Sequence, residues 1–146
     1  MRAVVQRVSE ASVRVNGTIK GKIDKGLLIL LAVHEDDNES QLEWVANKCR
    51  RLRIFEDEEG KMNRSVEDIS GEILVISQFT LYGDVKKGTR PSFIHSAGPE
   101  KGDEYYKKVI DHLEAAMPGK IQTGEFRAKM EVSLVNDGPV TIIVER

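Results

Sequence analysis

Hydrophobic and polar residues follow two periods along this chain, and the change of period separates predicted strands from predicted helices. Residues 3–8 predict a first strand. Alternation on both sides of Asn16-Gly17 predicts a hairpin, because both central residues of a type I′ turn need a positive φ. The run from 27 to 33 is wholly apolar and predicts a buried strand. The first third of the chain is therefore predicted to be β.

A helical period follows, with apolar residues recurring at intervals of three and four. These residues are Leu42, Val45, Ala46, Cys49 and Leu52. Asn38 is a suitable N-cap, and Gln41 stands where a capping box has its second side chain. A second amphipathic helix is predicted to start near Pro99 and to end before Pro118-Gly119.

The rest of the chain has β-type patterns. Ile54-Phe55 predicts a short strand, and the acidic stretch 56–60 predicts a solvated turn; a metal site there is the weaker alternative, because the spacing of a calcium loop is missing. Strands are predicted at 121–126 and from Met130 to Leu134. A turn at Asn136-Asp137-Gly138-Pro139 and a strand at 140–144 complete the chain.

The central stretch carries the candidate chemistry. Residues 73–76 are continuously aliphatic, as in a strand that is buried on both faces, and Ser77, Gln78 and Thr80 follow directly. A buried polar group without a partner costs about 1 to 3 kcal/mol. These side chains are therefore expected either to hydrogen-bond within the fold or to face a pocket, and the pocket is the sharper interpretation.

A segment rich in glycine and cations lies between this stretch and the second helix. Residues 83–93 include Lys86, Lys87 and Arg90 and have no apolar period, so they predict a mobile basic loop. A solvated connection is an equally good interpretation until a phosphate partner is implied.

Composition limits the possible classes of protein. The chain has 146 residues and a net charge of −2, which fits one domain and gives no overall sign of nucleic-acid binding. The single Cys49 excludes an internal disulfide, and its place on the helical stripe favours a buried residue over a nucleophile. No signal-like or membrane-spanning apolar run is present. A soluble cytoplasmic protein is expected.

Four strings in order resemble the D-aminoacyl-tRNA deacylases. They are Met1 to Val8, Ser77 to Tyr82, Arg90 to Phe93 and Asn136 to Thr141. Pattern and resemblance together predict an α/β fold: one compact domain over residues 1–146, whose mixed and antiparallel sheets form a barrel-like core with two main amphipathic helices. The resemblance also implies a homodimer with active sites at the subunit interface.

The resemblance implies hydrolysis of the ester between a D-amino acid and the terminal ribose of tRNA, and also of mischarged glycyl-tRNA. No cofactor and no metal site is assigned. In the family, Ser77-Gln78-Phe79-Thr80 forms one wall of the pocket. A cis Gly138-Pro139 peptide bond from the other subunit faces it and rejects L-substrates. Met130 is assigned to the adenine pocket, with a core position as the alternative. Arg7 is expected to hold the Gly-Pro segment, with a surface cation as the alternative.

Two routes could drive the hydrolysis. Thr80 could act as a nucleophile, but an activated hydroxyl normally has a base within hydrogen-bond reach. Of the three histidines, His95 is the one to test as that base, and it is expected not to be one. The family instead suggests that backbone amides around Phe79 and Thr80 stabilise the oxyanion while the ribose 2′-hydroxyl assists water.

Two other classes of function remain open from the sequence. The chain could be an RNA-binding module, which would bind aminoacyl-tRNA without releasing the amino acid. It could also be a non-RNA hydrolase or a small-ligand binding protein, and free D-aminoacyl esters would then serve equally well.

Overall fold

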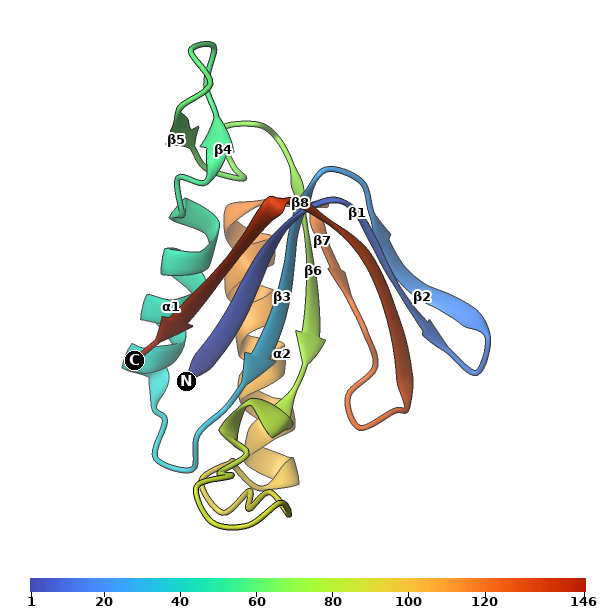
Figure 1. The fold of residues 1–146 in the computed structure, drawn as a ribbon, viewed down its shortest axis with the longest axis vertical. Coiled ribbons are helices and arrows are strands. Elements are labelled where there is room, and N and C mark those ends of the chain that lie inside the picture. The colour runs from blue at the N-terminus through green and yellow to red at the C-terminus, as the bar shows by residue number, and fades with distance from the viewer.

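One mixed sheet organises the computed structural model, which describes residues 1–146, and bends over on itself (Figure 1). Its strands are β1 (Arg2–Val15), β2 (Thr18–Ile23), β3 (Gly26–Ala32), β6 (Glu72–Ser77), β7 (Ile121–Thr123) and β8 (Met130–Glu145). The order is β2-β1-β3-β6-β7, and β8 pairs along β1. The β3-β6 and β6-β7 pairs are parallel and the others antiparallel.

The bend brings β2 back toward β6 and β7 and nearly closes the sheet. A Cβ at Gly21 of β2 would lie 2.8 Å from the Thr123 carbonyl oxygen and 3.1 Å from a Leu74 methyl group. Only glycine permits this approach, since it carries no Cβ. The predicted α/β domain with a barrel-like core is confirmed.

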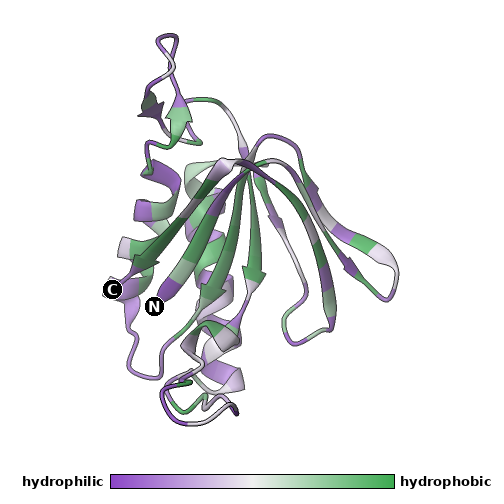
Figure 2. Cartoon of the chain, viewed as in Figure 1, coloured by the Kyte–Doolittle hydropathy of each residue, from purple (hydrophilic) through white to green (hydrophobic).

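Alternate residues of the central strands feed two separate cores, as predicted for strands buried on both faces. Ile73 and Val75 of β6 join the core beneath α1 (Glu39–Arg51) and α2 (Pro99–Ala116). Leu74 and Ile76 point the other way, into the space enclosed by the bent sheet. Figure 2 shows β3 and β6 as almost wholly hydrophobic, while the helices are hydrophobic on part of their surface.

The local signals at the helix starts and the first hairpin are confirmed. Asn38 accepts from the Ser40 amide at 2.9 Å and Gln41 accepts from the Asn38 amide at 3.1 Å, which completes the capping box. Pro99 occupies the first turn of α2. Asn16 and Gly17 have φ of 50° and 78°, as the type I′ turn requires.

Cys49 and the acidic turn have structural roles. Cys49 is 2% exposed, and burial raises the pKa of its thiol to about 12, so it is not a nucleophile at neutral pH. The acidic turn joins β4 (Phe55–Glu56) to β5 (Met62–Arg64). Asp57 accepts from the Asn63 side chain and the Lys61 amide, and these bonds hold the pKa of its carboxyl below the usual value. Its carboxylate is thus engaged within the turn.

Four details differ from the sequence-based prediction. The first strand runs on to Val15, and the strand at 121 ends at Thr123. The chain forms a short 3₁₀ helix, η1 (Phe79–Tyr82), after β6. The predicted turn at 136–139 is wrong, because β8 continues through this stretch as a bulge.

The bulge in β8 arises from its pairing with β1. Gln6 pairs with Thr141 and Val8 with Asn136, so Arg7 alone lies opposite the four residues 137–140. Such an insertion bends a strand and redirects the side chains near it.

None of the helices has the length and apolar character to span a bilayer.

Candidate functional site

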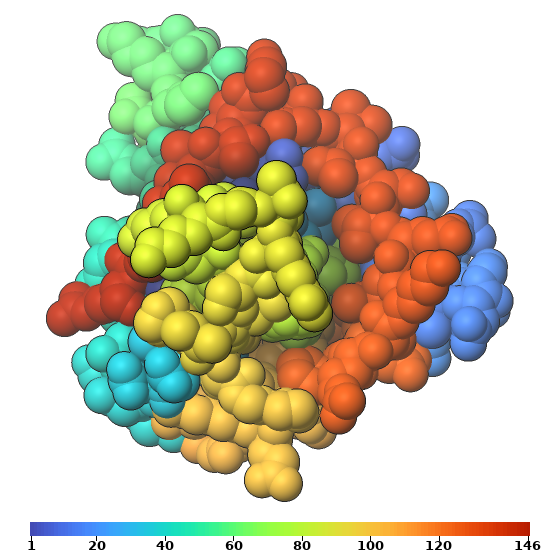
Figure 3. All heavy atoms as spheres, turned by 60° about the horizontal axis from the view of Figure 1, so that its bottom comes forward, coloured from blue at the N-terminus to red at the C-terminus, as the bar shows by residue number.

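A cavity of about 380 Å³ opens where β6 ends. Its walls include Ser77, Gln78, Phe79 and Met130, together with the segment 126–128 that leads into β8. Figure 3 shows this end of the molecule, hollowed between the loop after η1 in yellow and the segment entering β8 in orange. The structure therefore brings three of the four predicted wall residues together with Met130.

The end of the β-ladder gives this wall its backbone conformation. Ser77 pairs with Leu31, and the Gln78 amide donates to the Leu31 carbonyl at 2.8 Å. The chain then turns into η1, where the Leu81 amide donates back to the Gln78 carbonyl at 3.2 Å. The first amides of a helix have no acceptor within it. No other group of the chain accepts from the Phe79 or Thr80 amides, so both are free to bind a ligand.

The side chains near these amides supply no base. The side-chain amide of Gln78 donates a hydrogen bond to Thr80 Oγ1, and both residues are at the surface. No histidine or carboxylate lines the cavity. The Tyr106 hydroxyl donates to the Val75 carbonyl at 2.8 Å, and burial raises the pKa of this phenol to about 12. The site therefore has polar donors but no side chain able to accept a proton at neutral pH.

Met130 combines the two interpretations that the sequence left open. It lines the cavity and also packs against the core enclosed by the bent sheet. A Cβ at Gly124 would lie 2.5 Å from its sulfur, so the β7-β8 connection also limits the position of this side chain.

Arg7 lies at the opposite end of the sheet and is only 6% exposed. Its Nη1 donates to the Ile54 carbonyl at 2.6 Å and its Nε to the Asp137 carbonyl at 3.2 Å. It also forms an ion pair of 3.2 Å with the Asp137 carboxylate. Arg7 is thus a buried cation that binds the bulge of β8, rather than a surface residue.

The bulge presents backbone close to Arg7. The Gly138-Pro139 peptide bond is cis, and Gly138 has a φ of 125°. A Cβ on Gly138 would lie 2.8 Å from a Val140 methyl carbon and 3.1 Å from Arg7 Nη2. Asn136 fixes the far side of the bulge, since its side chain accepts from the Val140 amide at 3.1 Å. The conformation of this segment requires glycine.

One chain does not bring the Gly138-Pro139 segment to the cavity. Ser77 is in register with Leu31, whereas Arg7 pairs with Leu27 and through it with Ile73. Four residues of extended strand therefore separate Ser77 from the bulge along the strand direction, a distance of about 13 Å at about 3.3 Å per residue. Within one chain, the wall that contains Ser77 and the bulge are therefore apart.

Arg2 supports η1 and was missed from the sequence. Its Nη1 donates to the Leu81 carbonyl at 2.6 Å, and its guanidinium lies 4.8 Å from the centre of the Tyr82 ring. Glu145 holds the same guanidinium at 2.7 Å. An arginine at the edge of a predicted strand gives no signal of this role, because its partners come from distant segments.

The basic loop lies beside η1. Asp84 and Ser92 exchange backbone hydrogen bonds of 2.8 and 2.9 Å, which close the loop at its base. Lys86, Lys87 and Arg90 project from it, are exposed, and form no ion pair within the chain. These cations are available to an anionic partner.

Solved structures show the class of fold. A structure titled "c-Myc DNA Unwinding Element Binding Protein" superposes with a TM-score of 0.96 and 42% identity, covering 100% of this chain and 99% of that one. A structure described as a probable eukaryotic D-amino acid tRNA deacylase shares the fold, with a TM-score of 0.83 and 17% identity over 99% of this chain and 98% of that one.

Sequence comparison gives the family. Proteins named D-aminoacyl-tRNA deacylase are 56% identical in Thermotoga petrophila and 54% identical in Chloroherpeton thalassium; each match covers 99% of this chain, and 97% and 95% of the relatives. The sequence profile of the D-Tyr-tRNA(Tyr) deacylases matches residues 4–145. The chain belongs to this family, which confirms the resemblance seen in the sequence and makes the chain a hydrolase.

Proposed function

We propose that this protein hydrolyses the ester bond of D-aminoacyl-tRNA, and of mischarged glycyl-tRNA, to give free tRNA and the amino acid. Family membership supports the reaction. The observation that carries the mechanism is the pair of free amides, Phe79 and Thr80, at a cavity without a base. Because tRNA is charged and used in the cytoplasm, we place the activity there.

The free amides fit an oxyanion site. Attack on the ester carbonyl places negative charge on its oxygen, and one positioned donor is typically worth about 2.7 to 4 kcal/mol to that transition state. The 2′-hydroxyl of the terminal ribose lies next to the ester in any aminoacyl-tRNA and assists the attack by water. In this mechanism Ser77, Gln78 and Thr80 shape and orient the site.

Selection against L-substrates comes from a wall of backbone. Gly138 and Pro139 of the partner subunit point their carbonyls at the substrate α-carbon, so that an L side chain collides with them while a D side chain points elsewhere. Glycine has no side chain and passes. Arg7 holds this wall in place within its own subunit.

The homodimer is supported by two features. Within one chain the Gly138-Pro139 bulge and the cavity lie at opposite ends of the central strands, so a site that uses both needs two copies. Val135 and Ile143 lie on β8 on either side of the bulge and are 50% and 69% exposed. Large apolar side chains exposed beside a functional segment indicate a contact surface. We assign Met130 to the pocket of the terminal adenine, because its side chain lines the cavity.

Deacylation of matched D- and L-tyrosyl-tRNA tests the proposal. We expect release of D-tyrosine, with little release of L-tyrosine, and slow hydrolysis of a free D-tyrosyl ester that lacks the tRNA. Equal rates on both enantiomers would contradict the backbone filter. Tight binding without release would indicate an RNA-binding module, and equal rates on the free ester would indicate a non-RNA hydrolase.

Thr80→Ala separates the two hydrolytic routes. Thr80 Oγ1 accepts one hydrogen bond from Gln78, a contact worth about 1 kcal/mol. We expect the single-turnover rate to fall by less than about tenfold, since about 1.4 kcal/mol corresponds to a factor of ten. Complete loss of turnover, together with an acyl-threonine trapped in the parent enzyme and seen by mass spectrometry, would identify Thr80 as a nucleophile.

Binding of tRNA is expected to weaken steeply with salt. Each neutralised phosphate contributes a slope of about −0.7 to −0.9 to log K against log salt. Replacing Lys86, Lys87 and Arg90 by alanine should therefore reduce the slope by about 2 to 3, measured by filter binding. Lys25→Ala is the control, because Lys25 is exposed at the other end of β3. A slope unchanged by the triple substitution would exclude these contacts.

A further inference from the structure

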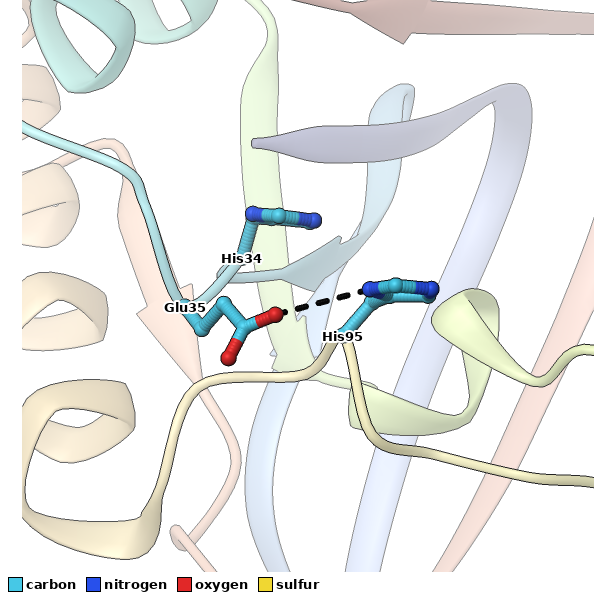
Figure 4. A group of neighbouring side chains, drawn as sticks. All are labelled: His34, Glu35 and His95. Carbon is cyan, nitrogen blue, oxygen red and sulfur yellow. Dashed lines mark ion pairs between the residues drawn. The ribbon is translucent and has the colours of Figure 1, made fainter.

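Two histidines and a glutamate from distant segments meet outside the cavity. His34 and Glu35 follow β3, and His95 belongs to the connection between η1 and α2. One candidate ligand atom from each of the three residues lies within 4.8 Å of the others. Figure 4 shows the three side chains side by side, with the imidazole rings nearly parallel. None of the three takes part in the proposed hydrolysis.

The backbone holds these side chains in place. The Glu35 amide donates to the His95 carbonyl at 3.1 Å, and His34 forms an isolated β-bridge with Ser96. Asp37, which is 5% exposed, accepts from the His34 amide at 2.7 Å. The two segments are thus joined by the main chain next to the cluster.

The spacing suits a transition metal. Zinc binds histidine nitrogen and glutamate oxygen at about 2.0 to 2.2 Å, which places neighbouring ligand atoms of a tetrahedral site about 3.4 Å apart. His95 Nδ1 and Glu35 Oε1 are 3.4 Å apart. The rings of His34 and His95 are stacked with centroids 5.8 Å apart. Asp36 adds a carboxylate 3.8 Å from His34 Nδ1.

We propose that His34, Glu35 and His95 bind a divalent transition metal, with Zn²⁺ as the probe, and that the metal fastens the segment directly after the basic loop (residues 83–93) to the end of β3. Two imidazoles and a carboxylate form a ligand set that zinc uses with a fourth position left open. The neighbouring residues Val33 and Ser96 line the cavity. The metal therefore fixes one edge of the cavity without contacting the free amides.

Zinc titration tests the ligand set. The chain, free of any polyhistidine tag and in a chelator-free buffer, should bind one Zn²⁺ by isothermal titration calorimetry. His95→Asn and Glu35→Gln should each weaken binding by more than about tenfold, the loss that even outer-shell changes cause. His34→Asn should do the same. His112→Asn is the control, since His112 lies on α2 outside the cluster.

Trypsin tests the clamp. Trypsin can cleave after Lys86 and Lys87 in the basic loop, whereas Pro91 blocks cleavage after Arg90. Lys61 in the β4-β5 turn is an internal reference for the protease itself. In the parent and in His112→Asn, zinc should slow cleavage in the loop but not at Lys61. In the variants of the cluster, zinc should slow neither. The proposal is overturned if zinc does not bind, or if His95→Asn and Glu35→Gln bind zinc as tightly as the parent does. It is also overturned if bound zinc leaves cleavage in the loop unchanged.

Discussion

Gly138→Ala is expected to lower the deacylation rate on D-tyrosyl-tRNA by about a hundredfold or more, the loss that a displacement of 1 Å in a positioned group can cause. The added Cβ would lie 2.8 Å from a Val140 methyl carbon and 3.1 Å from Arg7 Nη2, so the bulge must shift. The backbone also has a φ of 125°, where an L-residue costs on the order of 1 to 3 kcal/mol. The preference for D- over L-substrate should fall as well, because the filter is the displaced backbone. Single-turnover rates on both enantiomers measure these effects.

Gly60→Ala is the matched control for this substitution. Gly60 also has a positive φ, of 74°, but its Cβ would meet nothing within 4 Å, and it lies in the turn between β4 and β5. The Gly60→Ala enzyme should lose a little stability and keep the deacylation rate of the parent. A Gly138→Ala enzyme that remained folded and dimeric, with rates within threefold of the parent, would show that the bulge is not a wall of the site.

The elements predicted from the sequence are those whose causes are local. The hairpin at Asn16-Gly17 depends on two residues that accept positive φ, and the start of α1 depends on Asn38 and Gln41 within one turn. The double burial of β6 follows from its unbroken aliphatic run. In each case the residues that determine the structure are neighbours in the chain.

The elements that were missed depend on residues far apart in the sequence. Asn136 to Pro139 has the composition of a turn, but Arg7, 130 residues before Asp137, binds the segment as a bulge within β8. The wall that contains Ser77 was identified correctly as facing a pocket, whereas the free amides of η1 became visible only in the structure. The His34, Glu35 and His95 cluster likewise requires the 84–98 segment to return to the end of β3.

Arg7→Ala is expected to lower the free energy of unfolding by about 2 to 3 kcal/mol, since hydrogen bonds to charged groups contribute about 1.5 to 3 kcal/mol. Its guanidinium connects the Ile54 carbonyl to Asp137, and the Asp137 carboxylate is half-exposed and so remains solvated when Arg7 is removed. The bulge would lose its main support, so the deacylation rate should fall about tenfold or more even where the enzyme is folded. Urea unfolding and single-turnover assays give the two values.

Two further variants distinguish support of the bulge from loss of charge. Arg7→Lys keeps the charge but lacks the planar fork that reaches both carbonyls, so it should lie between the parent and Arg7→Ala in stability and rate. Arg14→Ala removes an exposed arginine of the same strand, whose contact is the Gly17 carbonyl at 3.2 Å, and should change the free energy of unfolding by less than about 0.5 kcal/mol. Full activity in a folded Arg7→Ala enzyme would mean that the bulge keeps its shape without Arg7, and the stereochemical filter would then depend on the Asn136 contacts alone.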